Sequence, residues 1–85
     1  MLDLSFNLIH HVPDLKTMPR LVDLFLIENR ISHLPVFPPL EHLRNLELGA
    51  NRIRTINGLD VLTNLTQLWL GKNKIEKLSV RVMHR

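Results

Sequence analysis

The side chains of this chain that could do chemistry are few, and they form no recognisable catalytic set. Ser5, Ser32 and Ser79 have no histidine and acid at a spacing that indicates a nucleophilic triad, and the chain contains no cysteine. No glycine-rich loop that would hold a nucleotide phosphate is present. We therefore expect a protein that is not an enzyme, with no cofactor and no small-molecule substrate.

The histidines are the remaining candidates for chemistry, through metal binding. His11 and His33 stand at equivalent places in the sequence, four residues after Asn7 and Asn29, and His10 is adjacent to His11. Two imidazoles could begin a metal site, but a third ligand is needed and none is well placed. We expect surface histidines and no metal.

A fixed interval of 22 residues separates four asparagines: Asn7, Asn29, Asn51 and Asn73. The same pattern of aliphatic residues surrounds each of them. A period of this length indicates a solenoid, in which equivalent positions of successive repeats form a ladder. We expect a single array of four repeats, at 1–20, 21–42, 43–64 and 65–85. The last repeat is incomplete, because Arg81 and His84 stand at positions that should be apolar.

The residues before each asparagine predict a short parallel strand. Leucines five and three places before the asparagine point to one side of an extended chain, and the residues between them point to the other. The asparagine lies where the chain leaves the strand, and its amide can donate to and accept from backbone groups that no sheet partner satisfies. We therefore predict that the four asparagines form an internal hydrogen-bonded ladder and do not bind a ligand.

The connection after each strand must return the chain with its apolar residues facing inward. Prolines remove amide donors and forbid a regular helix in the first two returns, at Pro13, Pro19, Pro35, Pro38 and Pro39. The third return, 57–62, has no proline and could close as a helical or 3₁₀ turn.

Composition suggests where the protein acts, and the two chain ends suggest that it is part of a longer solenoid. Mean hydropathy is +0.02, and no stretch could span a bilayer. The absence of cysteine excludes disulfides and favours an intracellular location, in the nucleus or the cytoplasm. Neither end has the polar cap that a solenoid needs, so we expect a fragment of a longer solenoid with both caps missing.

The residues that each strand turns outward form three ladders. The middle ladder consists of Asp3, Phe25, Glu47 and Trp69. The flanking ladders consist of Met1, Asp23, Asn45 and Gln67, and of Ser5, Ile27, Gly49 and Gly71. None of these twelve positions is basic, although the net charge is +3. This composition disfavours nucleic acid and indicates a protein-binding surface with aromatic anchors, which Gly49 and Gly71 leave accessible to a partner.

One basic ladder directly follows the asparagines and consists of Arg30, Arg52 and Lys74. Arg54 and Lys77 lie nearby in the sequence. Like charges at ~5 Å in water repel by only about 1 kcal/mol per pair, so a solvated edge accounts for it. The alternative is an RNA or anionic-lipid contact, which would make the protein a scaffold of an RNA-containing splicing complex. A generic structural adaptor is a further alternative.

Four segments carry a resemblance to a known family: Leu2 to Asn7, Leu24 to Ile31, Leu46 to Ile53 and Leu70 to Ile75. Together they resemble the 22-residue leucine-rich-repeat regulatory subunit of type-1 serine/threonine protein phosphatase. The resemblance implies an α/β leucine-rich-repeat solenoid, with short parallel strands on the concave face and irregular or 3₁₀ returns on the convex face. It also implies a non-catalytic subunit whose concave face binds the phosphatase catalytic subunit.

The resemblance extends to individual residues of the concave face. It implies Asp3, Phe25 and Glu47 as contacts with the catalytic subunit. Trp69 stands where the family usually has phenylalanine, and the proline-rich return after His33 also departs from the family pattern. We predict that Trp69, together with Asp23 and Ile27, belongs to the same contact surface.

Overall fold

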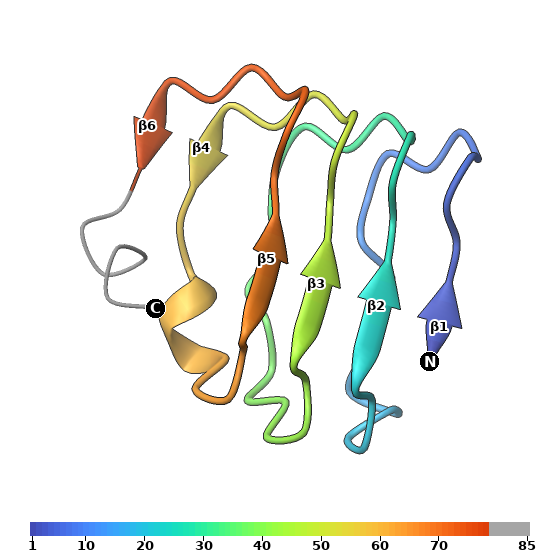
Figure 1. The fold of residues 1–85 in the computed structure, drawn as a ribbon, viewed down its shortest axis with the longest axis vertical. Coiled ribbons are helices and arrows are strands. Elements are labelled where there is room, and N and C mark those ends of the chain that lie inside the picture. Colours follow the sequence, from blue (N-terminus) through green and yellow to red (C-terminus); the bar gives the residue numbers. More distant parts are fainter. Residues whose placement is uncertain (79–85) are drawn as a thin grey trace.

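A computed structural model describes residues 1–78 as a two-layered solenoid, with strands in one layer and returns in the other (Figure 1). Four short strands form a parallel sheet in the order of the sequence. They are β1 (Leu2–Asp3), β2 (Asp23–Phe25), β3 (Asn45–Glu47) and β5 (Gln67–Trp69). The predicted fold class, a leucine-rich-repeat solenoid with short parallel strands, is confirmed.

The register of this sheet equals the sequence repeat. Leu2 lies opposite Leu24, Leu24 opposite Leu46, and Leu46 opposite Leu68. Each step along the sheet is therefore 22 residues, and equivalent positions become neighbours on adjacent strands. Because side chains alternate between the faces of a strand, every second column points into the core and the columns between point outward.

The core is dry in the two central repeats. The aliphatic residues flanking Asn29 and Asn51 are fully buried, at 0% exposure: Leu24, Leu26, Ile31, Leu46, Leu48 and Ile53. Their counterparts in β1 and β5, such as Leu2 and Leu68, are only half-buried and pack against the edge of this cluster. A central repeat is covered on both sides by a neighbour, whereas each of these strands has one described neighbour in the sheet.

The returns follow the distribution of proline. The first two returns contain no helix, and the third contains the 3₁₀ helix η1 (Leu59–Val61), so the prediction for 57–62 is confirmed. Gly58 precedes η1 with φ 73°, a left-handed conformation that glycine adopts without strain. Leu59 is fully buried, so this turn closes the core beneath it.

A second, smaller sheet joins two returns and was not predicted. Strand β4 (Thr55–Ile56) pairs in parallel with β6 (Lys77–Leu78). Both strands run opposite to the main sheet in Figure 1, because they belong to the descending part of the repeat. Their pairing keeps the third and fourth repeats aligned beyond the asparagine turn.

The asparagine side chains connect successive repeats through hydrogen bonds to the backbone. Asn51 Oδ1 accepts from the N–H of Ile31 at 3.0 Å, and Asn51 Nδ2 donates to the carbonyl groups of Leu26 and Leu48 at 2.9 and 3.0 Å. Asn29 and Asn73 make the equivalent bonds one repeat away on either side. Asn51 is 7% exposed, so its amide replaces water for backbone groups at the end of the strands.

The residue before each asparagine turns the chain out of the strand with a positive φ: Phe6 (59°), Glu28 (53°), Ala50 (55°) and Lys72 (58°). Such angles are unfavourable for residues other than glycine by about 1–2 kcal/mol. None of the four is β-branched, which is the side-chain type that would tolerate this conformation least. The asparagine bonds stabilise a turn that the chain would not adopt by itself.

Three predictions concern residues that the structure does not describe. Ser79, Arg81 and His84 lie outside residues 1–78. Within the described range, no helix is long and apolar enough to cross a membrane.

Asn51→Ala should lower the free energy of unfolding by about 2–4 kcal/mol, because buried backbone groups of two repeats lose their partner. Urea unfolding followed by circular dichroism measures the change. Asn7→Ala is the matched control: Asn7 is exposed and donates to carbonyl groups of its own repeat, so the loss should be about 1 kcal/mol or less. Equal losses in both variants would contradict the role given to the ladder.

Candidate functional site

The outward face of the main sheet carries one continuous column of acidic and aromatic side chains. Asp3 is the register partner of Phe25, Phe25 of Glu47, and Glu47 of Trp69. Strands of a parallel sheet lie about 4.8 Å apart, so neighbouring side chains of the column are in reach of one another. Asp3 and Trp69 are exposed, whereas Phe25 and Glu47 are half-buried. The column therefore presents two charges and two rings to any molecule that covers the sheet.

The indole of Trp69 rests on two glycines of the neighbouring ladder. A Cβ added at Gly49 would lie 2.6 Å from Trp69 Cδ1 and Nε1, and one added at Gly71 would lie 3.1 Å from Cζ2. The ring thus occupies part of the space above these glycines, and both glycines also line a hollow beside the ring, so a partner's approach at this place stays a prediction. Trp69 remains 60% exposed. The glycines support a ring that lies across the sheet with much of its surface available for contact.

The ladder on the other side of the column orients Glu47. Asn45 Nδ2 donates to Glu47 Oε2 at 3.0 Å, which restricts the carboxylate to one position. Asn45 Oδ1 is buried and accepts no hydrogen bond from the described residues. A buried acceptor without a donor is unfavourable by about 1–3 kcal/mol, so Asn45 orients Glu47 at some cost in stability. Asp23 and Gln67 are its neighbours in the same ladder.

Ser5 and Ile27 have different roles in the third ladder. Ser5 Oγ accepts from the N–H of Ile27 at 3.0 Å and so continues the strand pairing beyond β1. Ile27 is half-buried and lines a hollow with Trp69 and Phe6 at the carboxyl ends of the strands. Phe6 is 72% exposed because its positive φ turns the side chain away from the core. Phe6 extends the apolar part of this face. In the sequence, only the position of Phe6 directly before Asn7 could have indicated that its side chain is exposed.

The residues of this face that were predicted to contact a partner lie on one surface. Asp3, Phe25, Glu47 and Trp69 form its central column, Asp23 lies in one flanking ladder and Ile27 in the other. Below, we call these six residues the strand face. It carries three carboxylates and no basic residue, so its local charge is opposite to that of the chain as a whole.

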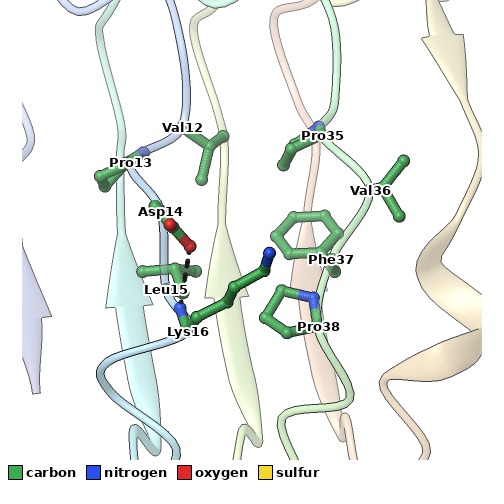
Figure 2. Close-up of a pocket in the computed structure, with 9 residues that line it drawn as sticks. All are labelled: Val12, Pro13, Asp14, Leu15, Lys16, Pro35, Val36, Phe37 and Pro38. Carbon is green, nitrogen blue, oxygen red and sulfur yellow. Dashed lines mark hydrogen bonds between the residues drawn. The ribbon is translucent and has the colours of Figure 1, made fainter.

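A separate hollow lies between the first and second returns, on the side away from the strands. Prolines and aliphatic residues line most of it, including Pro13, Pro35 and Pro38. Figure 2 shows Lys16 extended across the hollow toward Phe37 and Pro38. Asp14 Oδ1 accepts from the backbone N–H of Lys16 at 3.0 Å, so that carboxylate completes a turn. These residues offer no set of groups that could activate a substrate.

The histidines do not meet as the metal hypothesis would require. His33 Nδ1 lies 3.0 Å from Ser32 Oγ, and both His11 and His33 are exposed. Within residues 1–78, no three side chains of the metal-binding types gather at one point. His11, His33 and Ser32 thus belong to the turn surface.

Gly49→Ala should displace the indole of Trp69, because the added methyl group would overlap the ring. Trp69 is the single tryptophan of the chain, so its fluorescence reports the displacement directly. We expect emission at longer wavelength and stronger quenching by acrylamide than in the wild type. Gly71→Ala, where the contact is longer, should change both less. An unchanged spectrum in Gly49→Ala would show that the ring does not rest on Gly49.

Comparison with known proteins identifies the repeat. A family model described as leucine rich repeat matches residues 1–53, and one described as leucine rich repeats in two copies matches residues 41–81. No curated protein matches the chain significantly. Repeats of this kind generally mediate protein–protein interaction and are typically non-catalytic. The first match covers more than half of the sequence and agrees with the parallel sheet, so the chain belongs to the leucine-rich-repeat family.

Proposed function

We propose that this protein binds the catalytic subunit of type-1 serine/threonine protein phosphatase through the strand face, and thereby regulates its activity or its location. The observation that carries the proposal is the in-register column of Asp3, Phe25, Glu47 and Trp69. Asp3, Phe25 and Glu47 are positions at which the sequence resembles the phosphatase regulatory subunit, and Trp69 keeps an aromatic ring where that family usually has phenylalanine. We further propose an intracellular site of action, in keeping with a chain without cysteine.

The strand face has the physical properties of a binding surface. Its side chains project from a sheet whose backbone is fixed by interstrand bonds, such as Leu26 N to Glu47 O at 2.9 Å and Leu48 N to Trp69 O at 2.8 Å. A surface that is rigid before binding loses little conformational entropy on association. Exposed aromatic rings that become buried supply most of the affinity in many interfaces.

The charge of the strand face favours one kind of partner surface. Asp3, Asp23 and Glu47 would repel the phosphates of a nucleic acid, and they would attract a protein surface that carries lysine or arginine. The mechanism we propose is complementarity of shape and charge, with no chemical step performed by this chain.

The two departures from the phosphatase-subunit pattern affect different parts of the molecule. The proline-rich return forms part of the hollow in Figure 2, whose lining includes none of the strand-face residues. Trp69 in place of phenylalanine keeps an aromatic ring at the column and adds the support of Gly49 and Gly71. Trp69 therefore affects the fit to the partner, whereas the proline-rich return does not.

Direct binding to the purified phosphatase catalytic subunit tests the proposal. Titration calorimetry at moderate salt should detect a complex, and a pull-down from cell extract should recover the catalytic subunit. Absence of heat and of recovery would reject the phosphatase as the partner, while the family assignment would stand.

Trp69→Ala should weaken the complex by about 2 kcal/mol or more, since the largest exposed ring of the strand face is lost. Val36→Ala is the matched control, because Val36 is 97% exposed and lines the hollow on the opposite layer. It should leave the affinity unchanged. Unchanged affinity in Trp69→Ala, measured by the same calorimetry, would count against the strand face as the contact surface.

A further inference from the structure

A basic hollow lies at the edge of the solenoid, where the chain turns out of the strands. Its lining consists of Ser32, His33, Arg52, Arg54 and Lys74. Three cationic side chains thus surround one space, and no carboxylate lines it. All three are exposed, so a ligand can reach them from solvent.

The stacking of repeats brings these residues together. The N–H of Arg52 donates to the carbonyl of Ile31 at 2.8 Å, and the N–H of Lys74 donates to that of Ile53 at 3.0 Å. The segments after three successive asparagines therefore lie side by side. Ile53 is fully buried between Arg52 and Arg54, so both arginines extend away from the core on the same side.

The backbone that presents the cations is held in place by the asparagine ladder. Ile31 N donates to Asn51 Oδ1 at 3.0 Å, and Ile53 N donates to Asn73 Oδ1 at 2.9 Å. Ser32 Oγ lies 3.0 Å from His33 Nδ1, which fixes a hydroxyl group beside the cations. A ligand would meet a positioned set of donors, with ordering needed only in the long side chains.

The charges of the hollow are not balanced by its own lining. Like charges at ~5 Å repel by about 1 kcal/mol per pair in water. The nearby residue Glu76 carries a carboxylate, and its backbone N–H donates to the carbonyl of Arg54 at 2.6 Å. Glu76 does not belong to the lining of the hollow. A bound anion would replace this repulsion with attraction.

We propose that this hollow binds the phosphate group of a phosphorylated serine or threonine side chain in a partner protein. A phosphate monoester carries a charge of about −1.5 to −2 at pH 7 and three acceptor oxygens. Two guanidinium groups can each donate two parallel hydrogen bonds to such oxygens, and the lysine adds a point charge. The proposal concerns a surface other than the strand face and does not depend on the phosphatase as partner.

The distribution of charge favours a single phosphate over an RNA strand. A nucleic acid requires cations along an extended track, usually with aromatic rings on which bases stack. Here the position equivalent to Arg30 in the first repeat is Leu8, and the ladder directly before the asparagines contains Glu28. The lining of the hollow contains no aromatic ring apart from the His33 imidazole.

The test uses the complete chain and a glycine–alanine peptide carrying one phosphoserine, with the serine peptide, inorganic phosphate and a single-stranded RNA as comparisons. Fluorescence anisotropy should show that the phosphopeptide binds about tenfold or more tightly than the serine peptide, and inorganic phosphate should compete. Arg52→Gln/Arg54→Gln should lose this preference. Arg52→Lys/Arg54→Lys, which keeps the charge, should lose part of it.

Arg20→Gln/Arg44→Gln is the matched control, because both arginines are exposed and lie outside the hollow, and the change in net charge is the same. It should bind the phosphopeptide like the wild type, and circular dichroism should show the same fold in all variants. Equal losses in the two glutamine variants would overturn the proposal in favour of bulk charge. It would also be overturned by an absence of phosphate preference, or by RNA binding that is tighter and depends on Arg52 and Arg54.

Discussion

The hydrogen bonds of the asparagine amides are the interaction on which the rest of this structure depends. A strand of two or three residues satisfies few of its own backbone groups, and the chain must leave it through a residue with positive φ. Asn51 offsets both disadvantages, since it binds backbone groups of two repeats at once. Replacement by an aliphatic residue would fill the same space but would leave those N–H and carbonyl groups buried without partners.

Because the asparagine amides fix the register, they also determine which side chains become neighbours on the strand face and in the basic hollow. On the strand face, each outward side chain lies beside the equivalent side chain of the next repeat, as Glu47 lies beside Phe25, so the acidic and aromatic residues gather in one column. The basic hollow arises in the same way from Arg52 and Lys74, on the other side of the asparagine turn. A protein of net charge +3 can thus present surfaces of opposite sign on adjoining sides of one ladder.

Features that follow from periodicity could be predicted from the sequence, and features that follow from individual contacts could not. The four strands, their parallel order and the turn at Leu59 all result from apolar spacing and the positions of proline and glycine. The pairing of β4 with β6 also follows the 22-residue period, since Ile56 lies opposite Leu78, but the sequence did not show that these short returns would form a sheet. The placement of the Trp69 ring over Gly49 depends on a rotamer that only the neighbouring backbone selects. The exposure of Phe6 depends in the same way on one dihedral angle.

The asparagine bonds join residues 20 or 25 positions apart in the sequence, as from Asn51 to Ile31 and to Leu26. Bringing such residues together requires closure of a loop of one repeat, whose entropic barrier grows only with the logarithm of its length. After one repeat has docked on its neighbour, the next repeat must close a loop of the same length, so folding spreads from repeat to repeat along the solenoid. The rate at which the chain folds should therefore be governed by the formation of the first pair of repeats, and assembly should spread from the central pair, where burial is most complete.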